Sequence, residues 1–334
     1  MTETPRPQPG DSASYEVVVP DDFPPVFSDS LAHARLSRTP GVKVRVYTSR
    51  PSAESELDER IWSAHTVLSI RSSTRFTHNV LASAPGLRHL ALWGTATDHV
   101  ALDAAHRLGI TVTNTPETAT DAVAEHALAL SLALARRIPE LDQRVREGEW
   151  PRGILTQLAG KTMGIVGTGA IGMQLARLAR GIGMEVLAVS LHADGEVPFS
   201  RPQWVRFVPL SELLQASDVV SLHGRLIEPN VRLFGAEQFT QMKPTALFIN
   251  TARGGLVDEA ALAEALRNET IAGAALDVFS REPLSKDSPL RYMPNVILSP
   301  HTAATTAEAL RAGLDMAVDN VLCFLEGRIQ HRVV

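Results

Sequence analysis

The sequence predicts an α/β protein with two doubly wound parallel sheets. Two observations carry this prediction. Short runs rich in Val, Ile and Leu alternate with helical stretches along the chain, which is typical of parallel sheets. The 334 residues also exceed the roughly 250–300 residues at which a single hydrophobic core stops growing, so more than one domain is expected.

The first series of strands and helices occupies roughly residues 15–115. Its strands are expected at Tyr15–Val19, Lys43–Tyr47, Thr66–Ile70 and Leu87–Leu92. Helical spacing separates them, as at Ser52–Ala64 and His78–Ala84. Residues 1–14 are polar and Pro-rich and lack the apolar stretch of a secretory signal, so we expect a flexible tail there.

A long helix is expected at Ala119–Arg137, because this stretch contains no Gly or Pro and is dominated by Ala and Leu. It is apolar on most faces, so we expect it to be buried between layers or at an interface. An ordinary core helix and a crossover helix between two domains both agree with this pattern.

The second series begins at Lys161. Its strands are expected at Thr162–Val166, Glu185–Val189, Val205–Val208, Val219–His223, Ala246–Asn250, Gly273–Val278 and Val296–Leu298. A long helix at Thr305–Leu325 follows the final strand and could pack back on the first series.

Charge and composition exclude several classes of protein. The 32 basic and 37 acidic residues give a net charge of −5, without the basic excess of a nucleic-acid binder. No apolar run approaches the roughly 18 residues needed to cross a bilayer, so no membrane partner is expected. The single cysteine, Cys323, excludes an internal disulfide framework and a cysteine-based zinc site, and we expect no metal. A reducing cytoplasm is the expected setting.

The motif Gly167–Gly172 joins the expected strand Thr162–Val166 to a helical run. A lone GxGxxG is weak evidence, but the strand–turn–helix context is that of a dinucleotide-binding fingerprint. Gly167 permits the tight turn, Gly169 lets the backbone approach a pyrophosphate, and Gly172 lets the helix pack closely on the strand. A glycine-rich turn without a ligand is the alternative.

The helix start and the second strand end bear on which dinucleotide is bound. N–H groups such as those of Ala170 and Ile171 offer hydrogen bonds and partial positive charge to phosphates. The fingerprint expects an acid at the end of the second strand, where this chain has Ser190 and His192. Both side chains could donate to a 2′-phosphate, and no carboxylate repels it. This favours NADP and leaves NAD open.

Three strand ends further along the chain carry polar residues. Arg253 follows one strand, Asp277 and Glu282 follow the next, and His301 follows the last. Each has an ordinary explanation: a solvated Arg, a loop carboxylate before Pro283, or a His that caps a helix. Together they supply a cationic anchor, a carboxylate and a titratable imidazole, the set that hydride transfer between a carbonyl and an alcohol requires.

These motifs make the chain resemble the D-isomer-specific 2-hydroxyacid dehydrogenases, which include 3-phosphoglycerate dehydrogenase, glyoxylate/hydroxypyruvate reductases and D-lactate dehydrogenase. The resemblance covers about Tyr15–Leu325. It is carried in order by Gly167–Gly172, Ile249–Glu259, Asp277–Pro283 and Ser299–His301. It implies a Rossmann NAD(P)-binding domain, residues 119–303, inserted into a flavodoxin-like substrate domain made of residues 15–118 and 304–334.

The resemblance also implies an activity. The protein would be an NAD(P)-dependent oxidoreductase that interconverts a small anionic 2-keto acid and its D-2-hydroxy acid, of the glyoxylate/hydroxypyruvate or 3-phosphoglycerate type. Arg253 would hold the substrate carboxylate and polarise the ketone. His301 would be the general acid/base, and Glu282 would pair with it and orient its ring.

Further contacts follow from the same resemblance. In the cofactor domain, contacts to the dinucleotide would come from His223, Thr251, Ala252, Arg253, Asp277 and His301. In the substrate domain, Arg71, Ser72, Gly94 and Thr95 match loops that contact substrate. A homodimer through the cofactor domain is also implied.

The chain departs from the family pattern at two places. Ser190 replaces the usual acid, and Gly224-Arg225 stands where an apolar residue and a Pro commonly lie beside the adenine. A binding module that resembles the C-terminal-binding-protein corepressors, which use the dinucleotide to drive assembly, is the alternative function. Formate dehydrogenase is rejected, because that relative would carry Gln in place of Glu282.

Overall fold

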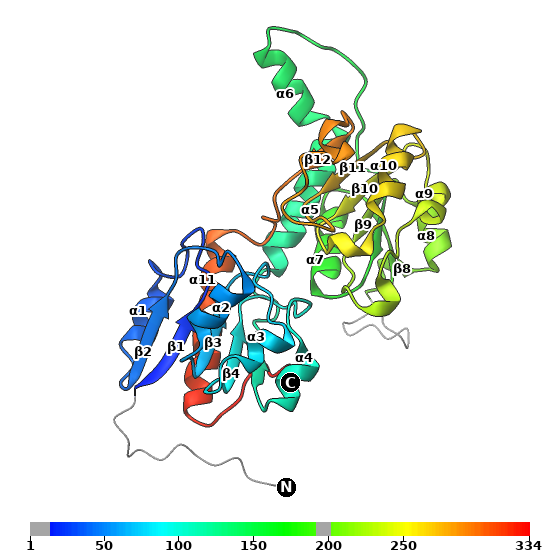
Figure 1. Ribbon diagram of the computed structural model, residues 1–334. Helices are drawn as coiled ribbons and strands as arrows, with labels where there is room; N and C mark the ends of the chain where they lie inside the picture. Colours follow the sequence, from blue (N-terminus) through cyan, green and yellow to red (C-terminus); the bar gives the residue numbers. More distant parts are fainter. Residues whose placement is uncertain (1–13, 192–201) are drawn as a thin grey trace. The chain divides into compact units, whose positions relative to one another are not determined.

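The computed structural model describes residues 14–191 and 202–334 of the 334-residue chain. These residues form two compact units (Figure 1). The first contains the chain up to Ala119 and again from Thr306, and the second contains Thr120–Thr305.

The first unit is built on a five-stranded parallel sheet with the strand order β2-β1-β3-β4-β5. Its strands are β1 (Tyr15–Val19), β2 (Val42–Val46), β3 (Thr66–Ser69), β4 (His89–Leu92) and β5 (Thr111–Thr113). Its helices are α1 (Leu31–Ser37), α2 (Glu54–Ile61), α3 (His78–Ala82), α4 (Leu102–Arg107) and α11 (Ala307–Leu325). This strand order is the flavodoxin-like one.

Helices cover both faces of this sheet because successive side chains of a strand point to opposite faces. Val17 and Val19 of β1 belong to a buried cluster with Leu36 of α1 and Val318 of α11. Val18 belongs to a second buried cluster with residues of α2, α3 and α4. The unit is therefore doubly wound, as the sequence predicts.

The second unit is built on a seven-stranded parallel sheet with the order β12-β11-β10-β9-β6-β7-β8. Its strands are β6 (Thr162–Val166), β7 (Glu185–Val189), β8 (Val205–Phe207), β9 (Val219–Leu222), β10 (Leu247–Asn250), β11 (Gly273–Leu276) and β12 (Val296–Leu298). The order is the Rossmann order extended by one strand at one edge, so the predicted fold class is confirmed.

Six α-helices and three short 3₁₀ helices belong to the described part of this unit. The α-helices are α5 (Thr120–Ala135), α6 (Ile138–Arg146), α7 (Ala170–Gly181), α8 (Leu210–Ala216), α9 (Ala236–Gln241) and α10 (Glu259–Arg267). The 3₁₀ helices are η1 (Glu228–Asn230), η2 (Gly254–Leu256) and η3 (Pro289–Tyr292).

The apolar helix α5 is buried, as its composition predicts. Ala124 and Ala127 are fully buried in a cluster with Ile165 of β6 and Ile249 of β10. The hydroxyl of Ser131 donates to the Ala127 carbonyl of its own helix at 2.7 Å, which satisfies the polar group in this apolar layer. Small side chains on α5 allow the helix to lie close to its neighbours.

The strands expected from the sequence are confirmed, but strand β5 and helices α4 and α6 were missed. Strand β5 has a single apolar residue, Val112, whereas the equally short β8 and β12 have at least two each. The expected helix Ala119–Arg137 ends at Ala135, because Arg137 has a φ of 49° and the chain enters α6.

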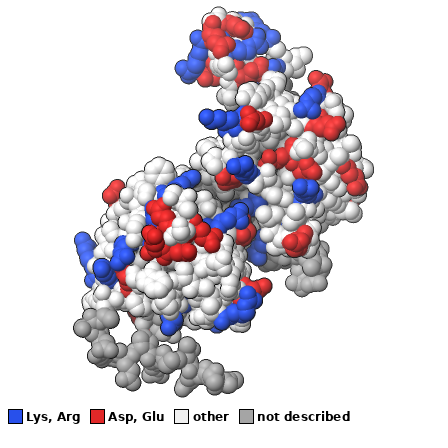
Figure 2. All heavy atoms as spheres, in the orientation of Figure 1, with Lys and Arg blue, Asp and Glu red and all other residues white. Residues whose placement is uncertain are grey.

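Helix α6 buries none of its residues and stands away from the sheet in Figure 1. Figure 2 shows charges of both signs gathered on it. They include ion pairs between Arg137 and Glu140 at 2.5 Å and between Arg146 and Asp142 at 2.9 Å. Such exposed pairs contribute at most about 1 kcal/mol each to stability. Because the helix also buries none of its residues, packing against this unit does not account for its stability.

Within residues 14–191 and 202–334, no helix has both the length and the apolar character needed to span a membrane. No group of three or more potential metal ligands gathers in the same part of the chain.

Candidate functional site

The glycine turn between β6 and α7 brings three stretches of backbone together. Gly167 has a φ of 103°, and a Cβ on it would lie 2.7 Å from the backbone carbonyl of His223. A Cβ on Gly172 would overlap the carbonyl oxygen of Gly167, so only glycine lets α7 start this close to the strand. A Cβ on Gly169 would meet nothing within 4 Å, which leaves that backbone open for a ligand.

The start of α7 fits a dinucleotide phosphate. Gly169 is the N-cap and brings no side chain to the first N–H groups, which include those of Ala170 and Ile171. The hydroxyl of Thr168 is buried in the turn and has no hydrogen-bond partner among the described residues. The Thr251 hydroxyl after β10 is in the same state. Free N–H groups and unsatisfied hydroxyls are what an anionic ligand would satisfy.

Ser190 directly follows β7 and is half-buried. His192 lies outside the described residues. A Cβ on Gly224, after β9, would lie 2.8 Å from the Leu191 side chain, so the ends of β7 and β9 are close. Arg225 is exposed next to Gly224. Arg225, an exposed cation, is therefore the neighbour of a residue that approaches the end of β7.

His223 follows β9 and is neutral in this setting. Burial lowers the pKa of its imidazole to about 4. Its Nε2 lies 2.9 Å from the Ser221 hydroxyl, and its backbone N–H donates to the Val166 carbonyl at 2.7 Å. Its backbone closes one side of the glycine turn.

Asn250, the last residue of β10, holds the turn that carries Arg253. Its side-chain nitrogen donates to the Arg253 carbonyl at 3.0 Å, and its side-chain oxygen accepts from the Ala252 N–H at 3.0 Å. Gly254 packs so closely on the backbone of Phe279 that any side chain would overlap it. This close approach brings the loop of Arg253 beside the loop of Glu282.

The side chains of Glu282 and His301 are hydrogen-bonded to each other. The Nδ1 atom of His301 lies 2.7 Å from Oε2 of Glu282, and the Phe279 N–H donates to Oε1 at 3.1 Å. Partial burial opposes ionisation of Glu282. The bonds from His301 and Phe279 and the charge of Arg253 outweigh it, so the pKa of the carboxyl lies below its ordinary value. The imidazole keeps Nε2 for another partner.

The loop that carries His301 is held by Asp277, which follows β11. Asp277 is fully buried. Its Oδ1 accepts from the Ser299 hydroxyl at 2.6 Å and from the Thr302 N–H at 2.9 Å, and its Oδ2 accepts from the Ala303 N–H at 2.9 Å.

The predicted substrate residues lie in the first unit, at the ends of β3 and β4. Arg71 donates to the Pro24 carbonyl, and burial outweighs the charges of Asp22 and Asp21 and lowers the pKa of its guanidinium. Ser72 is exposed beside it.

The turn after β4 contains the other two predicted substrate residues. Gly94 has a φ of 104°, and its N–H donates to the Thr115 hydroxyl at 2.6 Å. The Thr95 carbonyl accepts from the Asn114 side chain at 2.9 Å. Trp93, before this turn, packs against Gly313 of α11.

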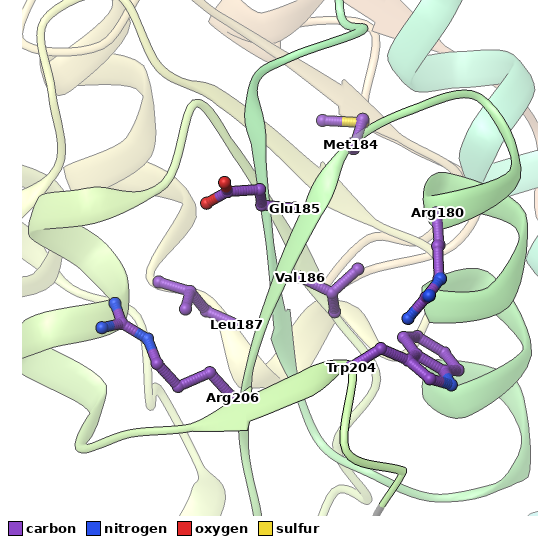
Figure 3. Close-up of a pocket in the computed structure, with 7 residues that line it drawn as sticks. All are labelled: Arg180, Met184, Glu185, Val186, Leu187, Trp204 and Arg206. Atoms are coloured by element: carbon purple, nitrogen blue, oxygen red, sulfur yellow. The ribbon is translucent and has the colours of Figure 1, made fainter.

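A hollow of about 470 Å³ lies elsewhere, beside β7 and β8 (Figure 3). Leu187 and Arg206 point to one side of the strand pair, and Val186 and Trp204 point to the other. The Arg180 guanidinium lies 4.9 Å from the centre of the Trp204 indole. None of the predicted site residues lines this hollow, which reaches the amino-terminal end of β7, whereas ligands of open parallel sheets bind at carboxyl ends.

Two side chains of this region, His126 and Ser299, are not among the predicted site residues, although Ser299 begins the motif Ser299–His301. The Nε2 atom of His126 on α5 lies 3.1 Å from the Ser299 hydroxyl and 3.6 Å from Oδ1 of Asp277. The signal in the sequence is a lone imidazole within an Ala- and Leu-rich helix.

The chain matches a family model described as "D-isomer specific 2-hydroxyacid dehydrogenase, NAD binding domain" over residues 128–303. It is 38% identical to a glyoxylate reductase of Korarchaeum cryptofilum, over 85% of this chain and 86% of that protein. It is 37% identical to a D-3-phosphoglycerate dehydrogenase of Archaeoglobus fulgidus, over 89% of this chain and 55% of that longer protein.

Two solved structures are similar over 96% of this chain and all of theirs. The TT0316 protein of Thermus thermophilus is 36% identical with a TM-score of 0.86. An acyclic imino acid reductase in complex with NADPH and D-Arg is 26% identical with a TM-score of 0.85.

Proposed function

Because the chain belongs to the D-isomer specific 2-hydroxyacid dehydrogenase family, we propose that Arg253, Glu282 and His301 carry out hydride transfer between a 2-keto acid and its D-2-hydroxy acid. Family membership makes the chain an NAD(P)-dependent oxidoreductase of 2-keto and 2-hydroxy acids. The observation that carries the residue assignment is the Glu282–His301 pair at 2.7 Å, on loops beside that of Arg253.

The proposed proton donor is Nε2 of His301. Its Nδ1 is engaged by Glu282, which fixes the ring and leaves Nε2 for the substrate oxygen. During reduction this nitrogen gives its proton to the ketone oxygen, and during oxidation it takes the proton from the hydroxyl. The permanent charge of Arg253 is proposed to hold the substrate carboxylate.

The proposed dinucleotide site lies at the carboxyl ends of the strands in the second unit. When bound, the dinucleotide supplies or accepts the hydride. Support comes from the uncapped start of α7, the open backbone of Gly169 and the unsatisfied hydroxyl of Thr168. The proposed residues are Gly167, Gly169, Ala170, Ile171, Gly172, Ser190, His192, His223, Thr251, Ala252, Arg253, Asp277 and His301.

NADP is the proposed form of the cofactor. At the end of β7, Ser190 presents no carboxylate to repel a 2′-phosphate. Arg225 is exposed near that strand end, and the similar imino acid reductase was solved with NADPH. We expect a lower KM for NADPH than for NADH, and we expect Arg225→Ala to raise only the former. A strong preference for NADH contradicts this proposal.

The first unit is proposed to be the substrate domain, with the second unit as the cofactor domain. Arg71, Ser72, Gly94 and Thr95 are proposed to contact the substrate, because they lie in the loops that follow β3 and β4, two adjacent strands of its sheet. The substrate class is that of the relatives, glyoxylate/hydroxypyruvate or 3-phosphoglycerate. A panel of glyoxylate, hydroxypyruvate, phenylpyruvate and 3-phosphohydroxypyruvate, followed by absorbance at the nicotinamide band, identifies which acid is reduced.

The protein is proposed to be a cytoplasmic homodimer. Helix α6 buries none of its own residues, and the side chains of Ile138, Trp150 and Ile154 are exposed on it and on the segment that follows it. Burial of these apolar groups against a second copy accounts for a helix that packs so little on its own unit. Sedimentation at low salt and high salt measures the oligomeric state.

The catalytic assignment is tested by His301→Ala. General acid–base catalysis supplies about 10²–10⁴-fold, so kcat should fall by that factor. His106→Ala is the matched control, because His106 is exposed on α4 in the other unit. If His301→Ala keeps kcat within about threefold of the control, the acid/base assignment is wrong.

A further inference from the structure

Asp277 connects three parts of the loop that carries His301. It binds the Ser299 hydroxyl before His301 and the N–H groups of Thr302 and Ala303 after it. The carboxylate is fully buried, so water does not compete for these bonds. The backbone on both sides of His301 is therefore held by one rigid group at the end of β11.

His126 adds a second support from α5. A serine hydroxyl has one proton, and here it goes to the Asp277 carboxylate, which only accepts. The Ser299 oxygen must then accept from Nε2–H of His126, 3.1 Å away. The direction of both hydrogen bonds is thus fixed: His126 donates to Ser299, and Ser299 donates to Asp277.

The conformation of His301 shows what this chain of bonds supports. His301 has a φ of 56°, a left-handed conformation that is costly for a residue with a side chain. Such a conformation persists only where the surroundings impose it. In this geometry the imidazole meets Glu282, whose other oxygen is held by Phe279, two residues after Asp277.

We propose that His126 and Ser299 are positioning residues which act through Asp277 to hold His301 in its left-handed conformation, with its imidazole on Glu282. The proposal rests on the proposed function in one respect, namely that His301 transfers the proton. Neither His126 nor Ser299 is proposed to touch the substrate or the dinucleotide.

The test removes the donor and then restores it. His126→Leu keeps a side chain of similar size without an N–H, whereas His126→Gln places an amide N–H near the position of Nε2. Ser299→Ala removes the link itself. Ser131→Ala is the matched control, because this buried hydroxyl on α5 bonds only within its own helix among the described residues.

We expect His126→Leu and Ser299→Ala each to lower kcat by about tenfold, as loss of a hydrogen bond to a charged network does, with little change in KM for the dinucleotide. The double variant should be no slower than Ser299→Ala, because both substitutions break one chain. His126→Gln should recover most of the rate, and Ser131→Ala should retain it.

A second measurement does not depend on turnover. The ¹⁵N chemical shifts of the His301 ring, measured at neutral pH in the cofactor-free protein, report its hydrogen bond to Glu282. We expect these chemical shifts to change in His126→Leu and to stay the same in Ser131→Ala. A loss of global stability alone does not move them in protein that is folded.

An unchanged kcat in His126→Leu, additive losses in the double variant, or unchanged ¹⁵N chemical shifts of the His301 ring would overturn the network. Thermal melts establish that each variant is folded. His301→Ala, measured in the same assay, separates the two ideas. If it stays active, the proposed function fails, whereas an inactive His301→Ala beside a fully active His126→Leu means that only the network fails.

Discussion

Replacing Gly254 with Ala should push apart the two loops that carry Arg253 and Glu282. Gly254 begins η2 directly after the turn of Arg253. A Cβ on it would lie 1.9 Å from the carbonyl carbon of Phe279 and 2.2 Å from the backbone nitrogen of Ser280. The backbone of Gly254 does not adopt a positive φ, so the conflict is purely steric.

The size of the effect follows from these distances. Ordinary van der Waals contact begins at 3.4 Å, so the two backbones must separate by about 1.5 Å to accept the methyl group. A displacement of 1 Å in a catalytic group can cost about 100-fold in rate. We therefore expect Gly254→Ala to lower kcat/KM by about 100-fold or more and to destabilise the fold by about 1–3 kcal/mol.

Gly255→Ala is the matched control for this prediction. The three atoms nearest to its Cβ would all belong to the Leu226 side chain, whose methyl groups would lie at 3.0 and 3.1 Å. A side chain can rotate away more easily than a backbone can move. The assay is kcat/KM for the best 2-keto acid, with urea unfolding of both variants. If Gly254→Ala is within about threefold of Gly255→Ala, then the close approach of the loops does not set the position of Arg253.

Three further predictions concern the pair, the turn and the first unit. The pKa of Glu282 lies below its ordinary value of 4.5, so the rate that its carboxylate supports should persist at neutral pH and be lost only as the pH falls below that value. Glu282→Gln should lower kcat/KM at pH 7 by about 10- to 100-fold and abolish the fall in rate at low pH. A pH–rate profile of this variant that still falls at low pH contradicts the role assigned to Glu282. Thr168→Val should raise the dinucleotide Kd about fivefold, as measured by calorimetry. It should not lower the melting temperature of the cofactor-free protein, because the hydroxyl bonds no described residue. An unchanged Kd argues against contact between this hydroxyl and the ligand. Gly313→Ala should destabilise the protein by about 1–3 kcal/mol in urea, since its methyl group would overlap the indole of Trp93, and an unaltered midpoint would show that the indole yields freely.

Much of the fold was predictable because its signals are local. The strand β6, the glycine turn and the start of α7 follow one another within Thr162–Ile171, where strand pattern and turn chemistry are read directly from neighbouring residues. The residues Arg253 and His301 were singled out for the same reason, since each stands in the loop that follows a strand. Strand β5 was missed because it has a single apolar residue, Val112, and helix α6 was missed because it has no buried face.

The contacts between these local pieces were not predictable in the same way. His126 and Ser299 are 173 positions apart, and nothing in either neighbourhood indicates that their side chains meet. Gly254 is a glycine because Phe279, from another loop, occupies the place of its side chain. A sequence pattern encodes which face of an element is buried, but it does not say what lies against that face.

By itself, then, the amino-acid sequence determined the two parallel sheets, the glycine turn and the strand ends at which Arg253, Glu282 and His301 stand. Those features depend on side-chain period, turn conformation and residue type, which act over a few neighbours. Only the tertiary structure decided that Asp277 holds the left-handed backbone of His301 and that His126 supports it. Close packing joins residues that are far apart along the chain, and those bonds exist only once the sheet has brought the strand ends together.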